Sequence, residues 1–186
     1  PLQEGVDAAV RAGIRMVKEA GVDMIKLDGA ADFPEAVTAL TRAGIPVWAQ
    51  FGITPQTALK YGMDYAAVSK PGVEIPAAMT EHLVNEAKML EKAGAALLDF
   101  TNSGPVAGPA VMAVATIPVI GGLGGGPWLD GRVRLANTAI GYGVKFLDDE
   151  FDTYANVSRT MLDALTTMIG EVRAGKQIKS ASPVKK

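Results

Sequence analysis

The sequence has no cysteine and a single histidine, and aromatic residues fill only 6% of its 186 positions. Without cysteine there can be no disulfide, thiolate metal site or cysteine nucleophile, which fits a reducing cytoplasm. No apolar run approaches the roughly 20 residues of a membrane span. Eighteen basic and twenty acidic residues leave a net charge of -2, which offers no broad attraction for nucleic acid or for an anionic membrane.

Apolar residues make up 48% of the sequence and charged residues 20%, which is enough for one globular domain with its own core. Pro1 is not an initiator residue, and a helical pattern begins almost at once. We therefore expect the beginning of the domain to be missing from this chain.

One pattern occurs three times: an amphipathic run with polar residues in its last turn, then Ala-Gly, then an apolar stretch. Glycine suits the C-terminal end of a helix, so each occurrence predicts a helix that leads into a buried strand. The glycines are Gly21, Gly44 and Gly94, and the apolar stretches cover residues 22–27, 45–49 and 95–100.

Two more apolar runs, residues 117–120 and 144–147, predict a fourth strand and a weaker fifth, and a helix is expected over about 108–115. Apolar strands that alternate with helices are typical of a parallel sheet, so the predicted class is α/β. The spacing of Asp32 and Glu35 also predicts a capping box at the start of a helix.

Polar or glycine residues follow four of these strands. In a (β/α)8 barrel the active site gathers at the C-terminal strand ends, whereas a doubly wound sheet binds ligands at one switch point. Four such strand ends favour the barrel, of which this chain would supply about the last five strands. The segments are Asp28-Gly29, residues 50–52, residues 101–104 and the glycine-rich residues 121–126.

The first of these strands carries two charges, Lys26 and Asp28, in an apolar context. Side chains alternate across a strand, so the two residues share one face. Buried charges are costly unless they pair, bind a metal or meet a charged ligand. The end of this strand is therefore the first candidate site, and the alternative is a structural ion pair.

The glycine-rich loop does not match a nucleotide-binding motif. Gly122 and Gly124 fit the first half of G-x-G-x-x-G, but Pro127 occupies the place of the last glycine, and no GK[ST] follows. What remains is a backbone that can approach a ligand closely and offer N–H groups to a carboxylate or phosphate. The alternative is a tight turn.

Four motifs in order resemble ketopantoate hydroxymethyltransferase, a family of the phosphoenolpyruvate mutase/isocitrate lyase superfamily of (β/α)8 barrels. The resemblance covers about residues 5–178, which we expect to form the C-terminal two thirds of the barrel domain. The first three strands of the family, with two metal-binding aspartates and a serine, have no counterpart here. The motifs are Lys26–Gly29, Phe51–Gln56, the glycine loop closing on Asp130-Gly131, and Glu171–Gly175.

The resemblance implies an enzyme of pantothenate biosynthesis that transfers a hydroxymethyl group from methylenetetrahydrofolate to 3-methyl-2-oxobutanoate. In this family the 2-oxo acid chelates Mg2+, which prefers oxygen ligands and stabilises an enolate. Lys26 matches the substrate-binding lysine, and Asp28 matches the metal-associated glutamate. Gln50, which stands where the family has histidine, is a candidate substrate contact. Gly122 and Gly124 are further candidates, because of the backbone N–H groups of the glycine-rich loop.

The catalytic glutamate of the family aligns with Thr101, and a two-residue shift would place it on Asp99. Asp99 and Thr101 lie on the same face of the strand, so Asp99 would present its carboxylate to the barrel interior from one layer deeper. Asp99 is therefore the candidate base and Thr101 a polar contact. Two alternatives stay open: a carbon–carbon lyase of the same superfamily, and a non-catalytic barrel remnant that serves as a subunit.

Three further expectations complete the sequence-based picture. His82 lies in a helical run with Glu81 and Glu86 and is interpreted as a solvated helix residue. Trp128 is a candidate to cover a ligand pocket. Residues 179–186 are expected to form a disordered tail, and an incomplete barrel with open edge strands is expected to form a homo-oligomer.

Overall fold

The computed structural model describes residues 2–54, 57–64, 77–121, 126–148 and 153–176. The chain divides into two compact units, Pro1–Val133 and Arg134–Lys186. Within the described ranges, no helix has both the length and the apolar character needed to cross a membrane. The predicted tail at residues 179–186 lies outside the described residues, and the single barrel domain over 1–178 stays a prediction.

The first unit is built on a five-stranded sheet with the order β1-β2-β3-β4-β5, in which every pair of neighbours is parallel. This order follows the sequence without the reversal of a doubly wound sheet, so the sheet is part of a (β/α)8-type barrel, as predicted. The strands are β1 (Ile25–Leu27), β2 (Val47–Gly52), β3 (Leu97–Thr101), β4 (Val119–Gly121) and β5 (Gly131–Arg132).

Helices connect these strands, and the three predicted helix ends are confirmed. Gly21, Gly44 and Gly94 all have positive φ angles, of 68°, 79° and 101°, which glycine adopts without steric cost. The helices are η1 (Leu2–Glu4), α1 (Val6–Ala20), η2 (Ala30–Asp32), α2 (Pro34–Arg42), η3 (Leu59–Tyr61), η4 (Ala77–Met79), α4 (Thr80–Lys92) and α5 (Ala107–Met112).

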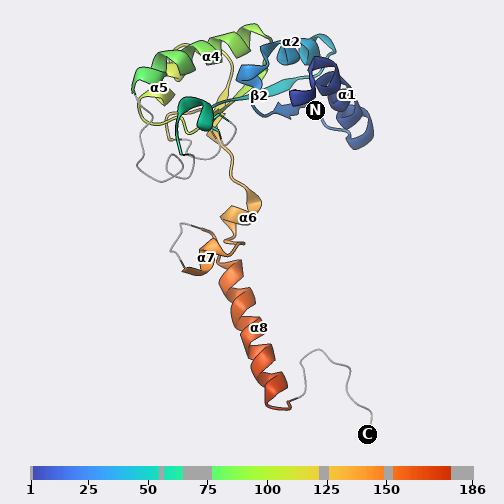
Figure 1. Ribbon diagram of the computed structural model, residues 1–186, viewed down its shortest axis with the longest axis vertical. Helices are drawn as coiled ribbons and strands as arrows, with labels where there is room; N and C mark the ends of the chain where they lie inside the picture. Colours follow the sequence, from blue (N-terminus) through green and yellow to red (C-terminus); the bar gives the residue numbers. More distant parts are fainter. Residues whose placement is uncertain (1, 55–56, 65–76, 122–125, 149–152, 177–186) are drawn as a thin grey trace. The chain divides into compact units, whose positions relative to one another are not determined.

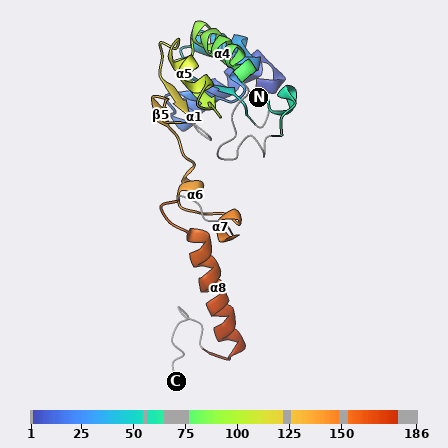
Figure 2. The ribbon, with the colours of Figure 1, turned by 90° about the vertical axis from the view of Figure 1, so that its left-hand side faces the viewer.

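The two faces of the sheet differ in chemistry. One face packs against helices such as α2 and α4 (Figures 1 and 2) and is apolar, with Phe51 and Phe100 stacked at a ring-centroid distance of 4.4 Å. Its other buried residues are Ile25, Leu27, Val47, Ala49, Leu98 and Val119. The alternate residues of the strands point to the opposite face, which corresponds to the interior of a barrel and carries the polar side chains.

Two predictions about local structure are wrong. Residues 145–148 form helix α7 (Lys145–Asp148), and the fifth strand is instead Gly131–Arg132, because a short apolar run does not distinguish a helix from a strand. The capping box is also absent: α2 has Phe33 at its N-cap without a side-chain hydrogen bond. Asp32 pairs instead with Lys60, a contact between distant segments.

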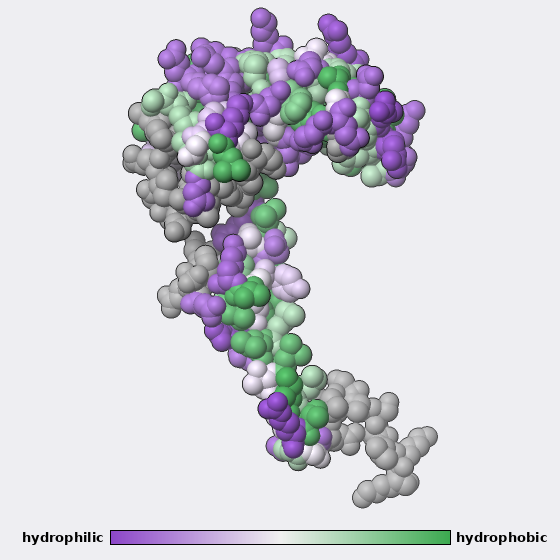
Figure 3. Space-filling view, in the orientation of Figure 1, coloured by the Kyte–Doolittle hydropathy of each residue, from purple (hydrophilic) through white to green (hydrophobic). Residues whose placement is uncertain are grey.

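The second unit contains α6 (Ala136–Ala139), α7 and α8 (Val157–Arg173). Asn156 caps α8, since its side chain accepts a hydrogen bond of 2.9 Å from the backbone N–H of Arg159. A stripe of exposed apolar residues runs along the length of α8 (Figure 3). Its members are Met161, Leu162, Leu165, Met168, Ile169 and Val172.

Candidate functional site

The candidate site centres on the ammonium group of Lys26 in β1. Its Nζ lies 3.1 Å from Oδ2 of Asp99 and also contacts Oδ1 of Asp28. The side chain of Lys26 is 35% exposed, that of Asp28 58% and that of Asp99 only 6%. The predicted meeting of Lys26 and Asp28 is therefore present, and the structure adds a third, buried charge to the pair.

Strand register explains how Asp99 reaches this position. Lys26 is level with Trp48 in β2, and the next pair along the pleat on the same face is Gln50 with Asp99 in β3. The long lysine side chain spans this offset, and its Nζ lies 5.7 Å from the ring centroid of Trp48. In the described structure, Oδ1 of Asp99 is buried and has no hydrogen-bond partner.

The electrostatics of the cluster keep Lys26 charged. Burial lowers the pKa of Lys26, but its hydrogen bonds to Asp28 and Asp99 outweigh that effect, so that the pKa is raised above 10.5. With both carboxylates ionised, the cluster carries one net negative charge. A cation that approached it would be attracted, and Asp28 is the exposed carboxylate available to meet it.

Gln50 connects three strand ends at the same edge of the sheet. Its Nε2 donates to Oγ1 of Thr101 over 3.2 Å, and its Oε1 accepts a hydrogen bond of 3.3 Å from the backbone N–H of Gly29. Next to them, Asn102 Nδ2 donates to the carbonyl oxygen of Ile53 over 2.7 Å. Lys26 with Asp99 and Gln50 with Thr101 thus form two separate polar contacts, and the register that pairs Gln50 with Asp99 places them side by side.

The remaining predicted residues lie apart from this group or outside the described structure. Gly122 and Gly124 fall outside the described residues. Trp128 donates from Nε1 to Oγ of the buried Ser103 over 2.9 Å. Its ring lies so close to Gly108 and Gly126 that a Cβ atom at either glycine would come within 2.0 Å of it. The role of Trp128 over a ligand pocket stays a prediction.

The side chains of this site could hold only a metal ion that needs few ligands from the protein. No group of three His, Cys, Asp or Glu residues within the described ranges is arranged to hold a metal ion. Mg2+, however, is usually held by one or two carboxylates, with water and substrate oxygens completing its shell. The exposed carboxylate of Asp28 fits that sparse requirement. The sequence could not reveal the Lys26–Asp99 contact, because it depends on the register of three strands.

The fold and this polar group define an α/β protein with a charged site at the C-terminal strand ends of a barrel-type sheet. Comparison with known families gives a narrower answer. The family model described as ketopantoate hydroxymethyltransferase matches residues 1–177, and the chain belongs to this family.

Curated relatives agree with this assignment. The 3-methyl-2-oxobutanoate hydroxymethyltransferase of Geobacillus thermodenitrificans (strain NG80-2) is 34% identical over 90% of this chain and 57% of its own length. The enzyme of the same name from Anaeromyxobacter dehalogenans (strain 2CP-1 / ATCC BAA-258) is 32% identical over 92% and 54%. The chain thus spans about half the length of the curated relatives it matches.

A solved structure, that of the Amycolatopsis orientalis BexX/CysO complex, is a more distant neighbour. One of its chains aligns with 95% of this chain and 68% of its own length, at 16% identity and a TM-score of 0.48. A likeness this slight does not bear on function.

Proposed function

We propose that this chain takes part in the transfer of a hydroxymethyl group from methylenetetrahydrofolate to 3-methyl-2-oxobutanoate, the reaction that forms ketopantoate in pantothenate biosynthesis. Membership of the family supports the reaction. The observation that assigns the reaction to particular residues is a contact at the strand ends: the ammonium group of Lys26 contacts the carboxylates of Asp28 and Asp99. This group combines a cation for an acidic substrate with oxygen ligands for a divalent ion.

Lys26 and Asp28 have the roles of substrate and metal contacts in this proposal. Lys26 binds the carboxylate or the enolate oxygen of the 2-oxo acid. Asp28 is more than half exposed, so its carboxylate can turn from Lys26 to Mg2+ at little cost in buried surface. When bound, Mg2+ supplies positive charge beside the enolate oxygen. Gln50 and Thr101 contact the substrate from the same edge, and Gly122 and Gly124 are proposed contacts outside the described residues.

Asp99 is the proposed base that removes the proton from C3 of the 2-oxo acid. A base needs a free lone pair within about 3 Å of the proton it takes. Oδ2 of Asp99 faces Lys26, whereas Oδ1 has no partner in the described structure. The contact with Lys26 fixes the position of Oδ2, and Oδ1 is the oxygen left to accept the proton.

The remaining parts of the proposal concern the cell compartment and the oligomeric state of the protein. The absence of cysteine supports a cytoplasmic protein. The strands β1 and β5 lie at the two edges of the sheet, and exposed edges favour association with another chain. We therefore include a homo-oligomer in the proposal.

Isothermal titration with 3-methyl-2-oxobutanoate in the presence of Mg2+ tests this function. We expect saturable binding that is at least tenfold weaker in Lys26→Met, because the variant removes the cation that meets the substrate. Lys60→Met is the matched control, since Lys60 also pairs with an aspartate but lies outside the site. If neither Mg2+ nor the acid produced heat, the proposal would be wrong.

A further inference from the structure

A second polar cluster in the first unit joins helix α4 to the turn η3. Oη of Tyr61 lies 2.9 Å from Nε2 of His82 and 3.1 Å from Oε1 of Glu86, and these last two atoms are 3.0 Å apart. His82 and Glu86 are four residues apart on α4, so one helical face presents both. Three donor atoms of the kinds that bind metals therefore form a nearly equilateral triangle.

Hydrogen bonds can occupy only two edges of this triangle at a time. A ring nitrogen of histidine either carries one proton or offers one lone pair, so Nε2 of His82 makes one good hydrogen bond at a time. It nevertheless lies within 3.0 Å of both the tyrosine and the glutamate oxygen. One edge of the triangle always lacks a well-placed proton, whereas a cation above the plane of the triangle would attract the lone pairs of all three atoms.

Burial and charge around the cluster also favour a cation. The side chain of Glu86 is only 9% exposed, and its Oε2 is buried with no partner in the described structure. Lys60 lies over the ring of Tyr61, but its charge is offset by the ion pair with Asp32. The ring of His82 is half exposed, which leaves a route by which an ion could enter from solvent.

We propose that Tyr61, His82 and Glu86 bind a divalent transition-metal ion of the kind that prefers imidazole and oxygen ligands, such as Ni2+ or Co2+. With metal–ligand distances of about 2.1 Å, the observed edges of the triangle give angles of about 90° at the ion. Such angles suit tetragonal or octahedral coordination rather than a tetrahedron. Water would complete the shell on the exposed side.

This site is separate from the one proposed for the 2-oxo acid. It uses none of Lys26, Asp28 or Asp99. The third donor is a tyrosine hydroxyl, so the site differs from clusters made only of histidine, cysteine and carboxylates.

Titration of the untagged, EDTA-treated full chain with Ni2+ tests the proposal. We expect one strong site at pH 7.5, with affinity at least tenfold lower in both His82→Gln and Glu86→Gln and reduced to a smaller extent in Tyr61→Phe.

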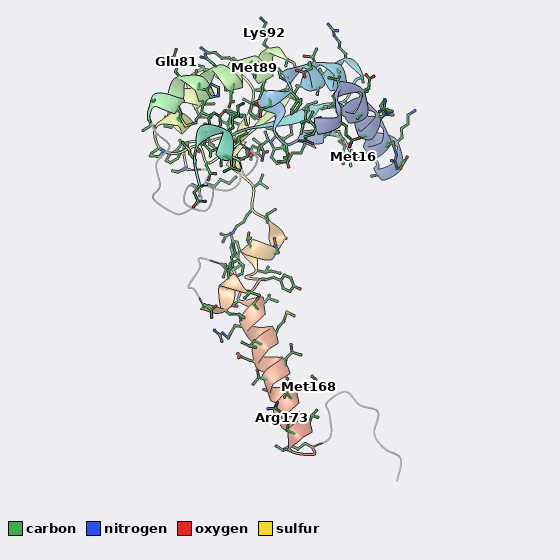
Figure 4. All side chains as sticks on the ribbon, in the orientation of Figure 1. Met16, Glu81, Met89, Lys92, Met168 and Arg173 are labelled. Carbon is green, nitrogen blue, oxygen red and sulfur yellow. The ribbon has the colours of Figure 1, made fainter. Side chains whose placement is uncertain are left out.

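Two controls separate this site from other sources of binding. Glu81→Gln removes the same charge from α4 at an exposed position that points away from the fold (Figure 4). Asp28→Asn removes the proposed magnesium ligand. Glu81→Gln should bind Ni2+ as the unchanged protein does. Asp28→Asn should keep the strong Ni2+ site that is lost in His82→Gln, whether or not the 2-oxo acid binds.

The proposal is overturned if Ni2+ gives no heat, or if His82→Gln binds as tightly as Glu81→Gln. Either result would mean that the triangle is a hydrogen-bonded support for α4. Circular dichroism should establish that each variant is folded. If Glu86→Gln did not fold, His82→Gln would decide the question, since its ring is half exposed.

Discussion

Lys26 Nζ lies 3.1 Å from Asp99 Oδ2, although their strands are separated in the sheet by β2. The contact ties a partly exposed cation to a buried anion whose other oxygen has no partner in the described structure. Removing the cation would leave that anion uncompensated, so this pair links the stability of the fold to the chemistry of the proposed site.

We therefore expect Lys26→Met to lower the free energy of unfolding. Breaking a fully buried pair costs roughly 3–5 kcal/mol, and the partial exposure of Lys26 reduces the expected loss to about 2 kcal/mol. Urea denaturation at pH 7 measures it. The double variant Lys26→Met/Asp99→Asn should recover at least about 1 kcal/mol, because it removes the unpaired charge. A double variant less stable than Lys26→Met would argue against the pair.

The end of β2 leaves no room for a side chain at Gly52. Its φ angle is +96°, and a Cβ atom there would lie 2.4 Å from the carbonyl oxygen of Thr101. We expect Gly52→Ala to destabilise the protein by about 3 kcal/mol, from backbone strain and a clash with rigid backbone. Gly29→Ala is the matched control: φ is +74° but nothing lies within 4 Å, so only about 1 kcal/mol should be lost. Equal losses would contradict the account.

Glu86 should make stability depend on pH. Burial raises the pKa of Glu86 above 4.5, and the neighbouring His82 and Tyr61 only partly oppose this. The folded state therefore holds this proton more tightly than the unfolded chain does. Its contribution to stability is complete below pH 4.5 and is lost as the pH rises through the raised pKa. With EDTA present, the stability of the unchanged protein relative to Glu86→Gln should fall over this range, and a rising difference would refute the assignment.

Asp28→Asn should separate metal binding from folding. The side chain of Asp28 is 58% exposed, and exposed ion pairs contribute at most about 1 kcal/mol to stability. We expect little change in the midpoint of urea unfolding, but at least tenfold weaker binding of Mg2+ measured by titration. Unchanged affinity for Mg2+ would remove Asp28 from its proposed role.

The sequence was a good guide where a local pattern determines the structure. The Ala-Gly ends of helices and the apolar runs that follow them predicted β1, β2 and β3, because glycine and burial act within a few residues. The pattern failed at residues 144–147, where four residues cannot distinguish a strand from a helix. It also missed β5, whose two residues, Gly131 and Arg132, have no apolar character and pair only because β4 lies beside them.

The candidate site, too, could be predicted only where a single strand determines it. Alternation along one strand placed Lys26 and Asp28 on a common face, and alternation in another did so for Asp99 and Thr101. The contact between Lys26 and Asp99, and the link from Gln50 to Thr101 and Gly29, depend on how three strands align. The triangle of Tyr61, His82 and Glu86 likewise joins segments about twenty residues apart, so its tyrosine could not be inferred from the helical spacing of His82 and Glu86.

The exchange of deuterium into C3 of 3-methyl-2-oxobutanoate tests the central claim most directly. In D2O with Mg2+, we expect the protein to speed the loss of the C3 proton signal well above the rate in buffer, without any one-carbon donor. Asp99→Asn should abolish this effect, while Lys60→Met should retain it. Exchange no faster than in buffer, with the acid shown by titration to be bound, would contradict the proposed formation of an enolate at Lys26 and Asp99.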